Sequence, residues 1–182
     1  MKIKSSASQL GGEIVIPASK SHTIRAVAIA AIAKGKSVLK NPLLSDDARS
    51  AIGGAKEMGA IVELGRDWII SGTGGVIGPH CRHIDVGNSG TSLRILTALS
   101  ALSGQPISFD GDKSIRQRPM LPLLSSLENL GVKVIESSDG KCPFTIQGPL
   151  LGGKTRVNGI SFDAADDPLE GCRKRIRSDV SA

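Results

Sequence analysis

Apolar and polar residues alternate in short blocks that predict a repeated order of strands and helices. An apolar run at 13–16 predicts a strand that ends at Pro17. The next segment predicts a helix that Ser19 or Ser21 caps and that Gly35 ends. The other elements predicted for this stretch are a strand at 37–39, a helix that begins at Ser45 and ends at Met58, and a hairpin of strands at 61–64 and 68–71.

The same order of elements returns about 70 residues further along the chain. The predicted elements are a strand at 84–86, a helix at about 92–103, a strand at 107–110, a helix at 121–130, and strands at 132–135 and 144–147. Both stretches read strand, helix, strand, helix, strand, strand. We interpret them as two copies of one βαβαββ unit, at about 13–72 and 84–148, with a third copy that begins at 154–161 and breaks off.

The composition changes after Ser161, where an acidic stretch is followed by a basic one without a clear hydrophobic period. Pro168 and Gly171 interrupt any helix there. We therefore expect residues 1–161 to form the folded domain and residues 162–182 to form a divergent, disordered tail.

Composition and charge favour a globular protein with small anionic ligands. The 182 residues are 40% hydrophobic and 22% charged, which is ordinary globular usage. Aromatic residues make up only 2%, which disfavours a surface that stacks single-stranded nucleic acid. The net charge is +6, and residues 162–182 carry four basic and five acidic side chains, so the body carries +7. This charge suits anions. Because the chain has so few aromatic residues and no basic run in the body, a nucleic-acid-binding domain is the least favoured interpretation.

The cysteines and the apolar runs indicate a cytoplasmic protein. The three cysteines are far apart and odd in number, so a disulfide framework is not expected. Lys2 and Lys4 lead into polar residues without the apolar stretch of a signal peptide, and the longest apolar run, at 26–33, is too short to span a bilayer. His80, Cys81 and His83 lack a partner cluster, so an exposed loop is favoured over a metal site.

Three segments carry residues that bind anions at the start of a predicted helix. The first contains Lys20, Ser21 and Arg25, and the unpaired N–H groups of a helix start attract anions. Lysine supplies a point charge, and arginine supplies a planar fork for phosphate or carboxylate. The competing interpretation is a capped surface helix whose charges are solvated.

The second and third segments have the same character. The turn at 87–91 holds two glycines, one of them Gly90, that let the backbone approach a ligand, and Asn88 and Thr91 can donate hydrogen bonds. It is not a Walker loop. The third segment, at 113–119, places Arg118 and two other cations before a helix. A flexible capped turn and a solvated basic loop are the alternatives for these two segments. Symmetry between the two units would let such helix starts face one crevice.

In their order and residues, these segments resemble the enolpyruvyl transferases, and in particular 5-enolpyruvylshikimate-3-phosphate synthase. The likeness rests on four motifs over residues 1–161: Ser-Lys-Ser at 19–21 with Arg25, Asn-Pro-Leu-Leu-Ser-Asp-Asp at 41–47, Gly-Asn-Ser-Gly-Thr at 87–91 with Arg94, and Arg-Gln-Arg-Pro-Met at 116–120. The Ser-Lys-Ser motif fits the sister family, UDP-N-acetylglucosamine enolpyruvyl transferase, less well. The resemblance implies an α+β fold of repeated βαβαββ units, an inside-out α/β barrel, incomplete here.

The resemblance also implies a reaction and its residues. The enolpyruvyl group of phosphoenolpyruvate moves onto the 5-hydroxyl of shikimate 3-phosphate, phosphate is released, and no metal or organic cofactor takes part. Lys20 would contact both substrates and act in catalysis. The implied substrate ligands are Ser21 and Arg25 for shikimate 3-phosphate and Asn88, Gly90 and Arg118 around phosphoenolpyruvate. Thr91 and Ser161 are further implied substrate ligands. Glyphosate would occupy the phosphoenolpyruvate site.

The chain departs from the family pattern at two places. Ile95 stands where the family usually has proline, and Phe162 and Asp163 follow Ser161 where the family continues Ser-Gln. The resemblance implies a second domain that carries further catalytic groups, and these 182 residues are too short to include it. Two readings therefore stay open: a short transferase, and a binding-only fragment that holds shikimate 3-phosphate or needs a complementing domain. The surface that the missing part leaves open predicts self-association.

Overall fold

The computed structural model describes residue 4 and residues 11–135, 139–158 and 177–181. In the first half of the chain the order is helix, strand, helix, strand, strand. These elements are α1 (Lys20–Ile32), β1 (Lys34–Leu39), α2 (Asp46–Glu57), β2 (Ile61–Glu63) and β3 (Trp68–Thr73). The three strands form an antiparallel sheet in the order β1-β3-β2.

The second half forms a four-stranded sheet and two α-helices. The elements are β4 (His83–Asp85), α3 (Gly90–Ser100), β5 (Pro106–Asp110), the 3-10 turn η1 (Ile115–Gln117), α4 (Leu121–Asn129), β6 (Lys133–Ile135) and β7 (Phe144–Gln147). The strand order is β4-β5-β7-β6, and only the β4–β5 pair is parallel. This half has the complete βαβαββ order that the sequence predicts for 84–148.

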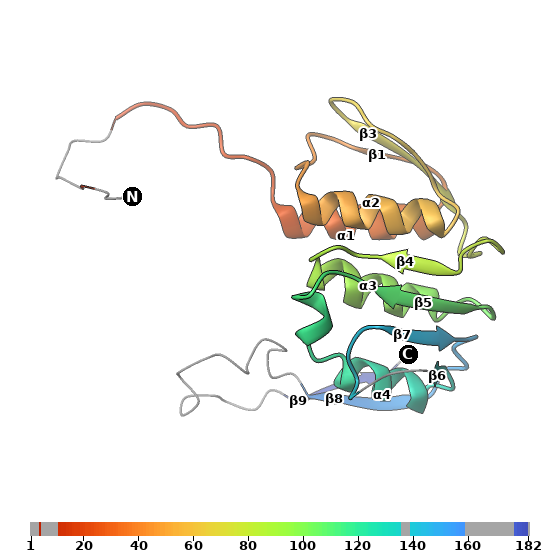
Figure 1. Cartoon of the computed structure of the whole chain (residues 1–182). Coiled ribbons are helices and arrows are strands. Elements are labelled where there is room, and N and C mark those ends of the chain that lie inside the picture. Colours follow the sequence, from red (N-terminus) through yellow and green to blue (C-terminus); the bar gives the residue numbers. More distant parts are fainter. Residues whose placement is uncertain (1–3, 5–10, 136–138, 159–176, 182) are drawn as a thin grey trace.

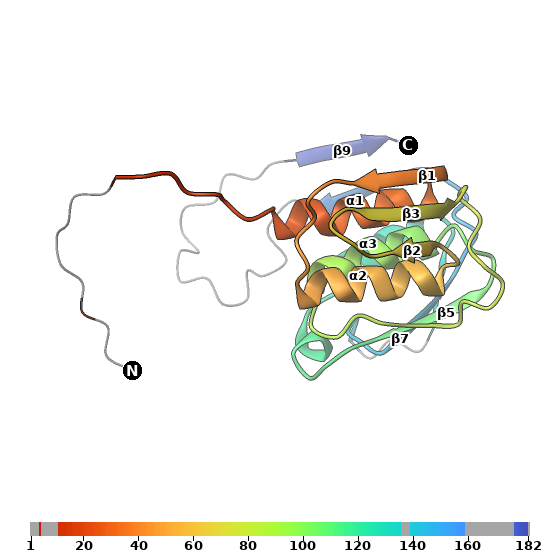
Figure 2. The ribbon, with the colours of Figure 1, turned by 90° about the horizontal axis from the view of Figure 1, so that it is seen from above.

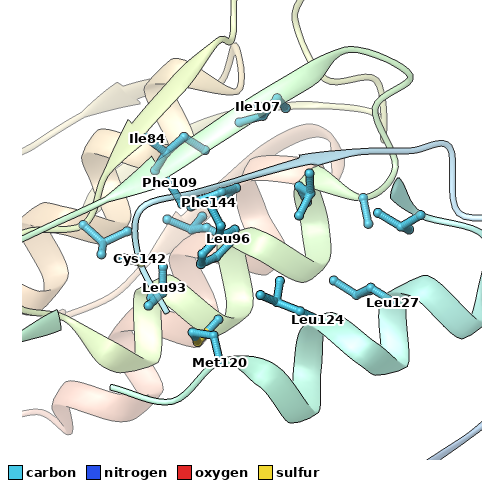
Figure 3. Close-up of a cluster of buried hydrophobic side chains, with 14 of the residues drawn as sticks. Ile84, Leu93, Leu96, Ile107, Phe109, Met120, Leu124, Leu127, Cys142 and Phe144 are labelled. Atoms are coloured by element: carbon cyan, nitrogen blue, oxygen red, sulfur yellow. The ribbon is translucent and has the colours of Figure 1, made fainter. Parts of the chain in front are cut away.

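Helices occupy the space between the two sheets. The first sheet lies over α1 and α2, and α3 follows beneath them beside β4 and β5 (Figures 1 and 2). One apolar cluster joins α1 and α2 to Trp68 and Ile70 of β3, which are 3% and 0% exposed. The larger cluster fills the second half, where Phe109 and Phe144 stack with ring centroids 5.5 Å apart (Figure 3). With so few aromatic residues, aliphatic side chains supply most of both cores.

The three strands of the first sheet correspond to β5, β6 and β7 of the second sheet, and β4 has no counterpart among the described residues. Ile70 of β3 lies opposite Ser37 and Val62, and Ile146 of β7 lies opposite Ile107 and Val134. The central strands β3 and β7 therefore correspond, and β1 corresponds to β5 with an offset of 70 residues. The same offset relates the helix caps Ser19 and Ser89. The internal repeat read from the sequence is present in the structure.

The expected strand at 13–16 is wrong in this structure. These residues are extended but unpaired, and Ile14, Val15 and Ile16 are 83%, 93% and 79% exposed. The offset of 70 aligns Pro17 with Gly87, whose φ is +56°. Proline holds φ near −65°, so Pro17 cannot adopt the positive φ that Gly87 has in the turn between β4 and α3. The chain before α1 consequently runs away from the first sheet (Figure 1).

Two smaller boundaries also differ from the expectation. Helix α1 ends at Ile32 and not near Gly35, because Gly35, with φ +88°, already lies within β1. In the segment expected to be a disordered tail, Arg177–Ser181 forms strand β9, which pairs antiparallel with β8 (Lys154–Asn158). Backbone hydrogen bonds with β8 explain how a segment without a hydrophobic period is held as a strand. The rest of the expected tail, 162–176 and 182, lies outside the described residues.

Candidate functional site

Helices α1, α2 and α3 all begin on the same side of the molecule, at the left in Figure 1. Each starts with a serine N-cap, namely Ser19, Ser45 and Ser89, whose hydroxyl accepts a hydrogen bond from the backbone N–H three residues further on. Serine is favoured at this position because it satisfies one of the unpaired N–H groups of the first turn. The remaining N–H groups and the helix dipoles give this side a positive potential.

Asp47, in the first turn of α2, connects the three helix starts. Its carboxylate Oδ2 lies 3.0 Å from the Nζ of Lys20, the first residue of α1. Its backbone carbonyl accepts a hydrogen bond of 3.2 Å from the Ser92 hydroxyl of α3. The Lys20 side chain is 52% exposed and the Asp47 side chain 21% exposed, so the ammonium group remains accessible to a ligand from solvent.

Arg118 covers the start of α3. A β-carbon placed on Gly90 would lie 2.6 Å from one terminal nitrogen of the Arg118 guanidinium, so only glycine leaves room for that group. The Arg94 guanidinium donates a hydrogen bond of 3.1 Å to the Gly90 carbonyl. The structure thus brings Lys20, Gly90 and Arg118, which are far apart in the sequence, around one carboxylate.

Only one of the three cations in the loop before α4 takes part in this cluster. Arg116 forms a two-pronged pair with Asp110, with distances of 2.9 and 2.6 Å. This hydrogen bonding outweighs the opposing effect of partial burial and holds the pKa of the Asp110 carboxyl below its ordinary value. Lys113 is exposed. The loop itself is tied to the turn before α3 by a 2.8 Å hydrogen bond from the Asp112 N–H to the Gly87 carbonyl.

The other predicted ligands surround the cluster less tightly. Ser21 and Arg25 lie on the exposed face of α1, and the Arg25 guanidinium donates a hydrogen bond of 3.1 Å to the Ser21 carbonyl. Asn88 is exposed in the turn before α3, and Thr91 is half-buried in its first turn. Ser161 lies outside the described residues.

The electrostatics of Asp47 reflect its position between cations. Partial burial by itself raises the pKa of the Asp47 carboxyl, but hydrogen bonding from Ser89 and Lys20 and the charges of Lys20 and Arg118 outweigh it. The pKa therefore lies below its ordinary value. Asp47 therefore stays ionised near neutral pH.

This lowered pKa predicts how stability depends on pH. The Lys20–Asp47 contact should stabilise the fold above the ordinary pKa of an aspartate, and the contribution should disappear as the pH falls through the lowered folded-state value. Because Lys20 is half-exposed, we expect less than about 1 kcal/mol. Urea unfolding at pH 7 should show Asp47→Asn less stable than the natural chain, and the difference in stability should disappear once the pH is below the folded-state pKa of Asp47. In a Lys20→Met background, Asp47→Asn should have a smaller effect at pH 7, and an equal effect would contradict the pairing.

Asp47 is a residue of the candidate site that sequence reasoning did not select. The sequence places it in a helix start, where acids commonly balance the dipole, and that local explanation suffices for the pattern. The sequence feature that could have identified Asp47 as a site residue is its place in the Asn-Pro-Leu-Leu-Ser-Asp-Asp motif. Only the packing of α1 and α3 against α2 shows that this carboxylate faces Lys20.

In the part of the chain that the structure describes, no group of three or more His, Cys, Asp or Glu side chains is placed to hold a metal ion. None of the helices within these residues has the length and apolar character to cross a membrane.

The βαβαββ order of the second unit and the cations at the helix starts agree with the fold and site expected of an enolpyruvyl transferase. The family model of EPSP synthase (3-phosphoshikimate 1-carboxyvinyltransferase) matches residues 4–165. The chain belongs to the EPSP synthase family.

Relatives and solved structures agree with this assignment. The chain is 40% identical over 163 residues to the 3-phosphoshikimate 1-carboxyvinyltransferase of Acetivibrio thermocellus, covering 88% of this chain and 38% of that protein. It is 41% identical over 149 residues to the enzyme of the same name from Chlamydia trachomatis, covering 81% of this chain and 34% of that protein. The EPSP synthase structure from Acinetobacter baumannii matches with a TM-score of 0.70 and 27% identity, over 75% of this chain and 32% of that one. The chain thus spans little more than a third of the length of these relatives.

Proposed function

We propose that this chain binds shikimate 3-phosphate and phosphoenolpyruvate and takes part in transferring the enolpyruvyl group to the 5-hydroxyl of shikimate 3-phosphate, with release of phosphate. The observation that carries the proposal is the Lys20–Asp47 pair, which lies among three helix starts beside Arg118. Both substrates carry phosphate, and one also carries a carboxylate next to the reacting carbon. Cations and N–H dipoles that are fixed before binding suit such ligands.

Within this proposal the residues have separate tasks. Lys20 would contact both substrates, and its position at the beginning of α1 and its contact with Asp47 support this role. Arg118 and the first turn of α3, with Asn88, Gly90 and Thr91, would hold phosphoenolpyruvate. Ser21 and Arg25 would hold shikimate 3-phosphate one turn along α1, and Ser161 is proposed as a further ligand from the resemblance alone.

Asp47 would then act as a positioning residue. It holds the Lys20 ammonium group near the start of α3 before a substrate arrives, which lowers the conformational entropy lost on binding. We also assign residues 1–161 to the N-terminal domain of the family, with the two repeat units at about 13–72 and 84–148 and a third that begins at 154.

Calorimetric titration with shikimate 3-phosphate tests the binding step. Lys20→Met should weaken the affinity by about 10- to 100-fold, since a hydrogen bond to a charged partner contributes about 1.5–3 kcal/mol. Lys34→Met is the matched control, because Lys34 is an exposed lysine just beyond the opposite end of α1. An equal loss in both variants, or no binding by the natural chain, would contradict the proposed site.

A phosphate-release assay with both substrates separates the transferase from the binding-only reading. Turnover by this chain supports the complete reaction. Binding without turnover, together with activity that appears when a C-terminal domain from a relative is added, supports the reading in which the chain needs a complementing part. This second interpretation is supported by coverage, because the chain covers only 38% and 34% of the length of the two relatives.

A further inference from the structure

The loop at 111–119, between β5 and α4, carries Arg118 and is held against the turn before α3. The Asp112 N–H donates a hydrogen bond of 2.8 Å to the Gly87 carbonyl in that turn. A β-carbon added to Gly111 would clash with the same Gly87 carbonyl oxygen, so the two segments are in direct contact. The position of the loop therefore decides where Arg118 meets the start of α3.

Within the loop, backbone hydrogen bonds close the single turn η1. The Asp112 carboxylate accepts hydrogen bonds of 2.9 Å from the N–H groups of Ser114 and Ile115, and the Arg118 N–H donates one of 3.0 Å to the Ile115 carbonyl. The Ile115 side chain is fully buried in the larger core. A single 3-10 turn has poor hydrogen-bond geometry and is weak by itself. A side-chain contact that fixes its orientation would consequently matter.

Arg116 supplies such a contact by joining η1 to the end of β5. Its Nε lies 2.9 Å from Oδ1 of Asp110 and its Nη2 lies 2.6 Å from Oδ2, and Asp110 is the last residue of β5. The Arg116 side chain is 51% exposed and the Asp110 side chain 22% exposed. A two-pronged pair of arginine and carboxylate fixes an orientation as well as a distance. The pair therefore holds the turn against a strand of the core sheet.

Arg118 depends on the orientation of this turn. A β-carbon on Gly90 would lie 2.6 Å from Nη1 and 3.3 Å from Cδ of Arg118, so the head and the stem of this half-buried side chain both lie over the start of α3. Its charge helps to lower the pKa of the Asp47 carboxyl. Arg116 is only two residues away on the same turn, and a rotation of η1 would displace the Arg118 guanidinium from Gly90.

We propose that Arg116 is a positioning residue, whose pair with Asp110 holds η1 so that the Arg118 guanidinium lies over the start of α3 before phosphoenolpyruvate binds. This inference rests on the proposed function, in which Arg118 holds that substrate. Arg116 acts through Arg118 and does not contact the substrate. An arginine that is fixed in advance loses less conformational entropy on binding.

The sign of one substitution separates this role from direct binding. If Arg116 contacted the substrate, Asp110→Asn would release it, remove a negative charge and strengthen the binding of an anion. If Arg116 positions the turn, the same substitution weakens the pair and should lower the affinity for phosphoenolpyruvate by about three- to tenfold. Arg116→Gln should lower it by a similar factor.

Calorimetry on the full chain measures these affinities, with phosphoenolpyruvate titrated in the presence of shikimate 3-phosphate. Lys113→Gln is the matched control, because it removes the same charge from an exposed residue of the same loop, and it should change the affinity by less than about twofold. The Asp110→Asn, Arg116→Gln double variant should bind no more weakly than either single variant. Arg116→Lys keeps the charge but loses the fork, so it should recover little.

Two further measurements exclude a general loss of structure. The affinity for shikimate 3-phosphate should stay within about twofold in each variant, because the ligands proposed for it lie on α1. Hydrogen exchange at the Arg118 amide, which is bonded to the Ile115 carbonyl, should accelerate in Asp110→Asn and in Arg116→Gln without any ligand.

Three results would each overturn the positioning role: tighter phosphoenolpyruvate binding by Asp110→Asn, additive losses in the double variant, or unchanged exchange at the Arg118 amide. A natural chain that binds neither substrate contradicts the proposed function instead. Exchange at the Arg118 amide then still decides whether the pair holds the turn.

Discussion

Alanine at position 72 should destabilise the chain by about 3 kcal/mol. Gly72 lies in β3 where α1 crosses it, and an added β-carbon would lie 2.2 Å from the Ala33 carbonyl oxygen and 2.3 Å from that of Ala30. Both neighbours are backbone atoms, so a side-chain rotation cannot relieve the clash. Urea unfolding should show a lower transition midpoint, because α1 must separate from the sheet.

Gly104→Ala is the control for this prediction. Gly104 is exposed, its φ is not positive, and an added β-carbon would have no neighbour within 4 Å. Its effect should stay within about 0.5 kcal/mol. If both variants lose the same stability, the close approach of α1 to β3 is not what makes Gly72 necessary. A loss at Gly72 should also weaken ligand binding, because α1 carries Lys20.

Gly90→Ala should leave the fold intact and weaken phosphoenolpyruvate binding by about tenfold or more. The new methyl group would occupy the place of the Arg118 guanidinium, which is the flexible end of a side chain and can move away. Position 90 begins α3, where alanine is acceptable to the helix. The variant therefore separates binding from stability, and this expectation rests on the proposed function.

Calorimetry with phosphoenolpyruvate and urea unfolding are the two measurements for Gly90→Ala. Gly53→Ala is the matched control, since this helical glycine has no neighbour within 4 Å of an added β-carbon and its replacement should stabilise α2 by up to about 1 kcal/mol. Unchanged affinity in Gly90→Ala would show that Arg118 does not serve the ligand from its present position.

Much of the secondary structure follows from local sequence signals. Ser45 and the two acids after it predict the start of α2, and the structure has that helix at Asp46–Glu57. The strand predicted at 144–147 is β7 with the same bounds. Such signals are sufficient because a cap, a turn residue or an apolar alternation acts within a few residues of itself.

The segment at 13–16 shows where local signals fail to predict a strand. Its apolar residues fit a strand, but a strand also needs a partner, and the partner is a property of the fold. Pro17 is a sequence feature that helps to explain why residues 13–16 do not pair with β1. Its meaning becomes clear only when the second unit shows that Gly87 occupies the equivalent turn with a positive φ.

By itself the sequence determined the repeated units, the helix starts that carry hydroxyls and cations, and the family to which these motifs point. Tertiary structure alone decided which groups meet: it pairs Lys20 with Asp47, sets Arg118 against Gly90 and turns Arg116 aside to Asp110. The physical reason is range. Helix and strand preferences are set by neighbours along the chain, whereas an ion pair between residues 20 and 47 depends on how α1 and α2 pack, which no single segment specifies.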